Sequence, residues 1–232
     1  MKSIVIIPTY NEKENIQHML PELMKLNKDL HVLVVDDNSP DGTGQIVESL
    51  AANEPRLHLL NRPGKGGLGR AYIAGFKWAI ENQFDYICQM DADFSHRLED
   101  LGKMLQRRGE ADVMVGSRWV KGGGTINWSW LRRFISKGGS FYSRQILGYK
   151  LRDWTGGFNM WKADVLKAIQ LDRIASEGYS FQIEMKFRAK KKGFSVEEMP
   201  ILFEERRAGQ SKMSLKIVLE ALYRVWSIRF AS

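Results

Sequence analysis

Residues 86–96 read Tyr86-Ile-Cys-Gln-Met-Asp-Ala-Asp-Phe-Ser-His96, an apolar run that ends in two aspartates one residue apart. The run predicts a buried strand. Side chains two residues apart in extended backbone point to the same face, so Asp91 and Asp93 would stand together. Two adjacent carboxylates repel unless a cation lies near them, and Mg²⁺ or Mn²⁺ prefers such oxygen ligands. The alternative is a turn at Asp91 and a helix N-cap at Asp93, because aspartate is common at both positions.

Strand and helix patterns alternate on both sides of this run. Further apolar strands are predicted at residues 3–7, 31–35, 57–60, 112–117 and 195–203. Helical spacing is found at residues 14–26, from 46 onward, and at 71–80, 98–105 and 180–188. This alternation predicts an α/β fold with a mainly parallel central sheet flanked by helices.

Polar residues follow the predicted strands where each one ends. They are Tyr10 and Glu12, Asp36 and Asp37, Asp91 and Asp93, and Ser117 and Arg118. Ligands of parallel α/β sheets bind outside the carboxyl ends of the strands. The sequence therefore predicts a polar site at one edge of the sheet, although turn propensity explains part of the pattern.

Composition restricts the class of protein. The 232 residues carry a net charge of +8, with 44% hydrophobic and 27% charged residues, which is typical of a globular chain. Cys88 is the single cysteine, so no disulfide framework exists, and this fits a reducing compartment. We find neither a signal peptide nor an apolar stretch long enough for a membrane span. A basic surface suits nucleic acid, anionic lipid or phosphorylated substrates, or serves only solubility.

The loop Gly64-Lys-Gly-Gly-Leu-Gly69 matches the G-x-G-x-x-G pattern of dinucleotide-binding folds. However, it follows the third predicted strand and not the first. No acidic residue outside the Asp91–Asp93 pair ends a predicted strand about 20 residues further on, where a ribose-binding acid would stand. We therefore favour a glycine-rich loop near a sugar or phosphate, with a merely flexible loop as the alternative.

The ordered motifs resemble a known family. They are Val5-Ile-Ile-Pro-Thr-Tyr-Asn-Glu12, Val34-Val-Asp-Asp-Asn-Ser-Pro-Asp-Gly-Thr43, Gly67-Leu-Gly-Arg-Ala-Tyr72, Met90-Asp-Ala-Asp-Phe-Ser-His96, Thr155-Gly-Gly-Phe158 and Gly178-Tyr-Ser-Phe-Gln-Ile-Glu-Met185. Together with Arg206 and Ser211-Lys212, they are similar to the inverting nucleotide-sugar glycosyltransferases of family 2. Within that family they most resemble the dolichol-phosphate (polyprenyl-phosphate) mannosyltransferases, over nearly the whole chain.

The resemblance implies a single GT-A domain over residues 1–232. Its nucleotide-sugar half would cover about residues 1–120 and its acceptor half about residues 121–232. It also implies GDP-mannose as donor, a polyprenyl or dolichyl phosphate lipid as acceptor, and Mg²⁺ or Mn²⁺ as cofactor. The metal would be held by Asp91 and Asp93. A relative has Gln, a third metal ligand, where Ser95 stands.

The resemblance assigns further roles residue by residue. The nucleotide-sugar site would comprise Pro8, Tyr10, Glu12, Val35, Asp37, Asp91, Ala92, Asp93, Arg118, Arg206 and Lys212. The catalytic residues among them would be Asp93, Arg118 and Arg206. The acceptor phosphate would be received by Arg118, Arg133 and Ser136.

The second half carries an amphipathic stretch from Asn127 to Arg144, after a Gly122-Gly-Gly124 run that suggests a mobile connection. Its aromatic residues are interleaved with Arg132, Arg133, Lys137 and Arg144. Trp with Arg and Lys on one helix suits a membrane interface. The alternative is an ordinary helix with aromatic core residues. A last amphipathic helix begins near Leu215, and Gln182 and Glu184 are candidate buried polar supports.

The resemblance, together with these patterns, implies a peripheral enzyme at the cytoplasmic face of a membrane, held there by basic charge, by the two amphipathic helices or by a separate anchoring subunit. No nucleic acid partner is expected, because acidic strand ends repel phosphates unless a metal is present. The rival functions are a UDP-glucose-dependent polyprenyl-phosphate glucosyltransferase, an NAD-dependent dehydrogenase and a nucleic-acid-binding protein.

Overall fold

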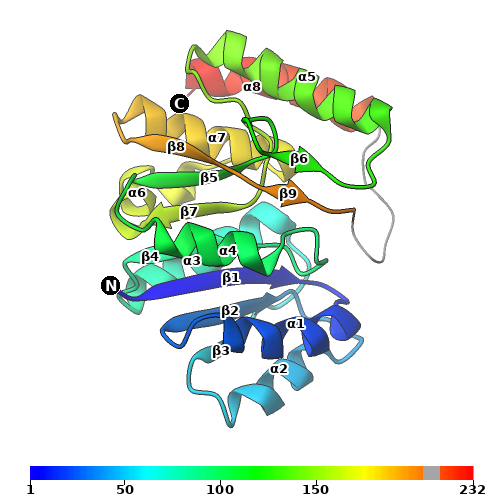
Figure 1. Cartoon of the computed structure of the whole chain (residues 1–232), viewed down its shortest axis with the longest axis vertical. Coiled ribbons are helices and arrows are strands. Elements are labelled where there is room, and N and C mark those ends of the chain that lie inside the picture. The colour runs from blue at the N-terminus through cyan, green and yellow to red at the C-terminus, as the bar shows by residue number, and fades with distance from the viewer. Residues whose placement is uncertain (206–214, 232) are drawn as a thin grey trace.

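The structure, a computed structural model, describes residues 1–205 and 215–231, and in the last helix it describes the side chains of residues 222–230. A seven-stranded sheet runs through the centre of the molecule (Figure 1), in the order β3-β2-β1-β4-β7-β5-β8. These strands are β1 (Ser3–Thr9), β2 (Leu30–Asp36), β3 (Leu57–Asn61), β4 (Tyr86–Gln89), β5 (Val113–Ser117), β7 (Asn159–Lys162) and β8 (Val196–Pro200). All pairings are parallel except those of β7, which is antiparallel to β4 and β5. The predicted α/β fold is confirmed.

Helices cover both faces of the sheet, because β1 and β2 present apolar side chains alternately to each side. On one face, α1 (Lys13–Leu26), α2 (Thr43–Ala51) and α4 (Leu98–Gln106) pack against Val5 and Ile7. On the other face, α3 (Leu68–Glu81), α6 (Ala163–Ala168) and α7 (Gly178–Lys191) pack against Ile4 and Ile6. A 3-10 turn, η1 (Leu171–Arg173), follows α6.

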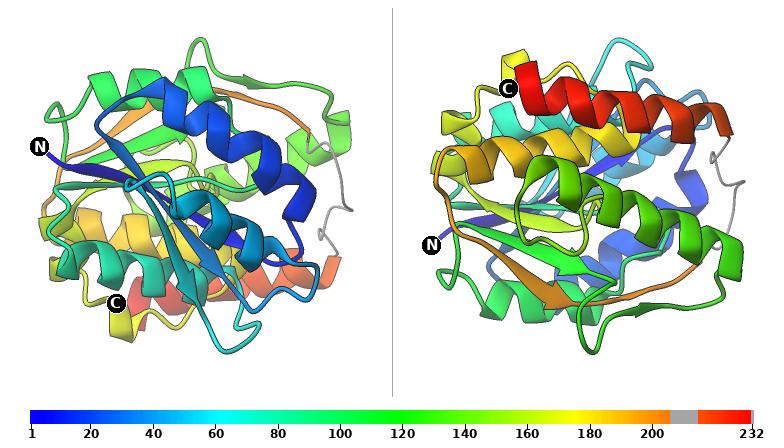
Figure 2. Two further views of the ribbon diagram at one scale, coloured as in Figure 1. Left: turned by 90° about the horizontal axis from the view of Figure 1, so that it is seen from below. Right: turned by 90° about the horizontal axis from the view of Figure 1, so that it is seen from above.

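Two further helices form an outer layer on the α7 side of the molecule. These are α5 (Trp130–Leu147) and α8 (Leu215–Ala231), and Figures 1 and 2 show both on this outer side of the molecule. Leu147, Val225 and Ile228 attach them to the core. Tyr142 joins the two helices directly, because its hydroxyl donates to the Leu222 carbonyl and accepts a hydrogen bond from Trp226 Nε1.

Three local features differ from the sequence-based expectations. The short strand β7 was not predicted. The predicted strand 195–203 is two strands, β8 and β9 (Leu202–Phe203), which belong to different sheets. Pro200 ends β8, since it has no N–H for a further ladder bond. The Gly122-Gly-Gly124 run is not a loose connection, because Gly124 lies in β6 (Gly124–Thr125), which pairs with β9.

Gly75 lies where α3 packs closely against the sheet. A Cβ atom at this position would lie 2.6 Å from Ile6 Cγ2 and 3.1 Å from Val35 Cγ2. Gly75→Ala should therefore lower the free energy of unfolding by about 1–2 kcal/mol, because overpacking outweighs the gain in helix propensity. Gly102→Ala on α4 is the matched control, since its Cβ would meet only Leu26 Cδ1, at 3.5 Å. Urea unfolding should show no loss for the control, and equal effects at both positions would contradict the prediction.

Candidate active site

The two carboxylates directly after β4 are held by neighbouring hydroxyl groups. The Tyr72 hydroxyl donates to Asp91 Oδ1 at 3.0 Å, and the Ser95 backbone N–H donates to Asp93 Oδ1 at 3.0 Å. The Ser95 hydroxyl also donates to Asp93 Oδ1. Burial raises the pKa of Tyr72 well above its ordinary value and the charge of Asp91 raises it further, so Tyr72 is a neutral donor. Asp93 holds a turn but does not cap α4, whose N-cap residue is Arg97.

The carboxylates lie where the order of the sheet reverses. The chain runs from β1 outward through β2 to β3, and then returns to place β4 on the other side of β1. A crevice at such a switch point, at the carboxyl ends of the strands, is the usual ligand site of open α/β sheets. The ends of β1, β2, β4 and β5 point to the same edge, so the sheet brings the predicted polar rim together.

The two aspartates at the end of β2, Asp36 and Asp37, have different structural roles. Asp36 is buried and accepts hydrogen bonds from the Thr9 hydroxyl, at 2.7 Å, and from Ser39. Asp37 pairs with Arg62 and accepts the Gly66 backbone N–H at 3.0 Å. Asp37 therefore fixes the glycine-rich loop that precedes α3, the helix that carries Tyr72. The loop follows the edge strand β3, which is not the place of a dinucleotide-binding loop.

The predicted residues Tyr10 and Glu12 directly follow β1 at the carboxyl edge of the sheet. Two other predicted residues, Val35 and Ala92, are buried. Tyr10 is exposed with Lys65 Nζ 4.0 Å above its ring, and Glu12 Oε2 accepts a hydrogen bond from Asn15. Pro8 is half-buried in β1. The side chain of Val35 is fully buried under α3, so it does not reach the rim as predicted for a nucleotide contact, and Ala92 is also buried.

His96 forms part of the wall behind Asp91 and was missed by sequence reasoning, although it ends the stretch with which the sequence analysis began. Its ring is stacked on Phe158, with centroids 4.8 Å apart, and stands edge-on to Phe203 at 5.0 Å. Its Nε2 atom lies 3.6 Å from Asp91 Oδ2. Neither ring nitrogen has a hydrogen-bond partner among the described residues. The imidazole is therefore buried beside the carboxylate of Asp91.

Arg118, at the end of β5, is held in place by the carboxylate of Asp153. It is only 5% exposed, and its Nε and Nη2 atoms donate to the two oxygens of Asp153 at 2.8 Å. Its guanidinium also lies about 5.5 Å from the rings of Trp119, Trp128 and Phe203. Burial lowers the pKa of Arg118, but the charge of Asp153 outweighs it and the net shift is upward. Arg118 is thus a permanent, oriented cation.

Lys186 adds a second buried positive group behind Arg118. Its Nζ donates to the carbonyl oxygens of Asp153, Trp154 and Gly156, at 3.1, 3.2 and 2.8 Å. Burial lowers the pKa of Lys186 to about 8, although the charge of Asp153 opposes that shift. Asp153 therefore contacts two buried cations, Arg118 through its carboxylate and Lys186 through its backbone carbonyl. Its carboxylate also accepts the Gly156 N–H of the 153–156 turn. Gln182 and Glu184 are buried supports as predicted, bonded to Asn159 and Ser176.

The strand ends supply two carboxylate ligands for a hard divalent cation, but no complete ligand set in the described residues. Asp91 is 32% exposed at its side chain, so its carboxylate reaches the rim. Over residues 1–205 and 215–231, no group of three or more His, Cys, Asp or Glu side chains is arranged to hold a metal. Two carboxylates alone leave most positions of a Mg²⁺ or Mn²⁺ shell open for water or a phosphate ligand.

Comparison with known protein families identifies the family to which the chain belongs. The family model described as glycosyl transferase family 2 matches residues 4–170. The chain belongs to glycosyltransferase family 2. It is therefore a glycosyltransferase, and the resemblance of its sequence motifs is confirmed.

Two curated relatives of this glycosyltransferase match nearly its full length. An undecaprenyl-phosphate mannosyltransferase from Micrococcus luteus is 48% identical over 225 residues, which cover 97% of this chain and 93% of the relative. A polyprenol monophosphomannose synthase from Mycolicibacterium smegmatis is 44% identical over 232 residues, which cover 98% of this chain and 88% of the relative.

Two solved structures share the fold of the glycosyltransferase at low sequence identity. A mannosyltransferase from Pyrobaculum calidifontis in complex with GDP-Man and Mn²⁺ has a TM-score of 0.60 and 17% identity, over 99% of this chain and 73% of that one. A glucosyl-3-phosphoglycerate synthase from Mycobacterium tuberculosis, with Mn²⁺, UDP and phosphoglyceric acid, has a TM-score of 0.68 and 13% identity, over 99% and 78%. The GT-A fold is thereby confirmed.

The start of α5 brings Arg132, and not the predicted Arg133, to the Arg118 cluster. The Arg132 guanidinium lies 3.9 Å from the Trp128 ring centroid and pairs with Glu205 at 3.0 Å. Arg133 is exposed on another side of the helix, and Ser136 is half-buried. Trp119 Nε1 and Trp128 Nε1 are buried donors without a partner in the described part of the chain. The predicted residues Arg206 and Lys212 lie outside the described residues.

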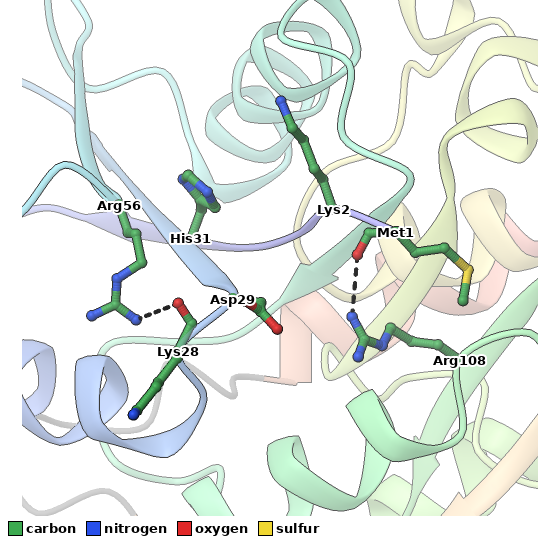
Figure 3. A pocket seen from close by; sticks show the side chains of 7 residues that line it. All are labelled: Met1, Lys2, Lys28, Asp29, His31, Arg56 and Arg108. Atoms are coloured by element: carbon green, nitrogen blue, oxygen red, sulfur yellow. Dashed lines mark hydrogen bonds between the residues drawn. The ribbon is translucent and has the colours of Figure 1, made fainter.

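A cavity of about 550 Å³ lies at the opposite edge of the sheet and does not belong to the candidate site. Figure 3 shows its lining residues Met1, Lys2, Lys28, Asp29, His31, Arg56 and Arg108. Arg56 bonds to Glu54 and to three backbone carbonyls, and Arg108 bonds to the Ser3 hydroxyl and the carbonyls of Met1 and Leu105. The hydrogen bonds of these two arginines therefore connect loops and helix ends at the amino ends of the strands.

Helices α5 and α8 are amphipathic, yet no helix in the described part of the glycosyltransferase is long and apolar enough to cross a membrane.

Proposed function

We propose that this glycosyltransferase transfers mannose from GDP-mannose to the phosphate of a polyprenyl or dolichyl phosphate lipid, with inversion at C1. The observation that carries the proposal is the similarity to two relatives with mannosyltransferase names over 97% and 98% of the chain. The geometry supports it, because an acidic pair and a buried cationic cluster both lie at the carboxyl edge of the sheet.

The donor would bind at the β1, β2 and β4 ends. Asp91 and Asp93 would hold Mg²⁺ or Mn²⁺, which supplies positive charge to a diphosphate leaving group when it is bound. Tyr72 and Ser95 keep the two carboxylates in place through their hydroxyl groups. Because the Ser95 hydroxyl donates to Asp93, its role in the proposal is to orient a ligand and not to replace the third ligand of a relative. Tyr10, Glu12 and Asp37 would line the nucleotide pocket, with Arg206 and Lys212 as further diphosphate contacts.

The acceptor phosphate would bind at Arg118 and Arg132, near Ser136. Both guanidinium groups lie beside Trp128, and Arg118 is pre-oriented by Asp153. A phosphate monoester is already anionic near neutral pH, so its oxygen can attack C1 without a strong general base. The protein then contributes position and charge, because the two arginines let one phosphate approach another.

A lipid acceptor places the reaction at a membrane surface. Peripheral binding at the cytoplasmic face, with or without an anchoring subunit, is part of the proposal.

Transfer of labelled mannose to a detergent-solubilised polyprenyl phosphate tests the proposal. We expect GDP-mannose to be preferred over UDP-glucose by roughly 10²-fold or more in kcat/KM, since a site built to hydrogen-bond one nucleotide rejects another strongly. Activity should be lost in excess chelator and return with Mn²⁺. NMR of the product should show inverted anomeric configuration. A preference for UDP-glucose would overturn the donor, and full activity of metal-free protein would overturn the metal.

A further inference from the structure

His96 is a buried histidine for which the described part of the chain provides no hydrogen-bond partner. The residue is only 3% exposed, and both of its ring nitrogens are buried without a partner there. Most buried polar groups in proteins are hydrogen-bonded, because leaving one unpaired costs free energy. A phenylalanine would give similar ring packing without that cost. The choice of histidine therefore indicates a role for its nitrogen atoms.

The turn after β4 brings His96 back against Asp91. Phe94, within this turn, has a φ of 59°, a left-handed conformation that bulky side chains rarely adopt. The side chain of Asp93 closes the turn through its hydrogen bonds with Ser95. As a result, the Nε2 atom of His96 lies 3.6 Å from Asp91 Oδ2. This distance is longer than a hydrogen bond, but contacts of this kind in active sites are often long until the substrate binds and then tighten.

His96 and Tyr72 approach different oxygens of the same carboxylate. The Tyr72 hydroxyl donates to Asp91 Oδ1 at 3.0 Å, whereas Nε2 of His96 lies beside Oδ2. Both rings are buried, while the Asp91 side chain is 32% exposed. Contacts at both oxygens prevent the carboxylate from rotating about its Cβ–Cγ bond. Each oxygen still keeps a lone pair for a cation, since a carboxylate oxygen has two.

Aromatic residues from the second half of the chain hold the imidazole in this orientation. Its ring is stacked on Phe158, with centroids 4.8 Å apart and an interplanar angle of 16°, and Phe203 stands edge-on to it at 5.0 Å. The backbone beside it is held from the same side, because the Glu204 N–H donates to the Ser95 carbonyl at 3.0 Å. The imidazole therefore has little freedom to turn away from the carboxylate.

We infer that His96 is a positioning residue, whose Nε2–H donates to Asp91 Oδ2 and fixes this carboxylate in the orientation that binds a divalent cation. The inference rests on the metal role of Asp91 in the proposed function and deepens it. His96 is not itself a ligand in this assignment, since no group of three His, Cys, Asp or Glu side chains in the described residues is arranged to hold a metal. Hydrogen-bond partners of a ligating carboxylate are typical of metal sites, and losing one lowers metal affinity about 10–100-fold.

Two substitutions separate this role from aromatic packing alone. His96→Gln keeps a donor, since the amide nitrogen can take the place of Nε2, but it loses the aromatic stack. His96→Phe keeps the stack and loses both nitrogens. We expect His96→Phe to lower the Mn²⁺ affinity, measured by calorimetry with GDP present, at least about tenfold, and His96→Gln to lower it less than about threefold. The melting temperature should follow the opposite order, because phenylalanine removes two buried unpaired nitrogens.

His58→Phe is the matched control, because His58 is also stacked on a ring, that of His31 at the amino edge of the sheet, and this variant should keep the Mn²⁺ affinity of the parent. A larger loss of affinity in His96→Gln than in His96→Phe would overturn the inference in favour of packing. A directly bound histidine nitrogen in the electron spin-echo spectrum of the Mn²⁺-loaded protein would overturn it in favour of a ligand role. Absence of Mn²⁺ binding by the parent would overturn the proposed metal site as well, whereas a loss in Asp93→Asn with none in His96→Phe would overturn this inference alone.

Discussion

Asp93→Asn should lower the rate of sugar transfer by roughly 10²–10³-fold, because it removes one of the two negative charges proposed to hold the divalent cation. The fold should survive the change. The oxygen that accepts the Ser95 N–H and hydroxyl can be kept by an asparagine Oδ1 atom. The loss should therefore come from weaker cation binding, and Mn²⁺ affinity measured by calorimetry with GDP present should fall in parallel with the rate.

The chain offers a close control for this substitution at Asp41. Asp41 Oδ1 accepts the Thr43 N–H at 3.0 Å and the Thr43 hydroxyl at 2.6 Å, the same turn that Asp93 forms with Ser95. Asp41→Asn removes a charge from an equivalent turn outside the carboxylate pair, so rate and Mn²⁺ affinity should stay close to those of the parent. If both variants lost activity equally, the turn would be the cause and the metal role of Asp93 would be wrong.

The sequence predicted the edge of the sheet at which the residues of the candidate site lie, and the physical reason is local. Parallel strands end at one edge, and the i, i+2 spacing of Asp91 and Asp93 places them on one face of the chain. Contacts between distant segments could not be read in this way. His96 is held by Phe158 and Phe203, and Arg118 is held by Asp153, which lies 35 residues further along the chain.

Two features show where local patterns stop being informative. One residue along a helix is a rotation of about 100°, so the choice between Arg132 and Arg133 depends on how α5 packs, which its periodicity alone does not fix. The strand β7 has four residues and is antiparallel between two strands that are far apart in sequence. Its formation depends on those partners more than on the propensity of its own residues.

Loss of the Asp153 carboxylate should have the largest effect on stability. Asp153→Ala leaves Arg118 and Lys186 buried without their shared counter-charge, and it also removes the acceptor of the backbone N–H groups of Arg118 and Gly156. Removing one partner of a buried ion pair costs about 3–5 kcal/mol. Asp172→Ala is the control, because Asp172 is largely exposed where it pairs with Lys77, and such a pair contributes at most about 1 kcal/mol. Urea unfolding at pH 7 measures both.

The pH dependence separates the contribution of Lys186 from that of Arg118. Burial lowers the folded-state pKa of Lys186 to about 8, below its ordinary 10.5, so the unfolded chain binds the proton more tightly. Its penalty is fully present below pH 8 and is relieved as pH rises through that window. Loss of the Asp153 charge, which opposes that shift, lowers the pKa of Lys186 further in Asp153→Ala. The stability deficit of the variant should therefore narrow as pH rises from 7 to about 9.5 and persist in part, because Arg118 keeps its charge. Adding Lys186→Met should remove the narrowing. The interpretation would be wrong if the loss of stability in Asp153→Ala neither exceeded that of the Asp172→Ala control nor changed with pH. Asp153 would then not hold the two cations. The fixed orientation of Arg118, on which its proposed role at the acceptor phosphate depends, would then have no explanation.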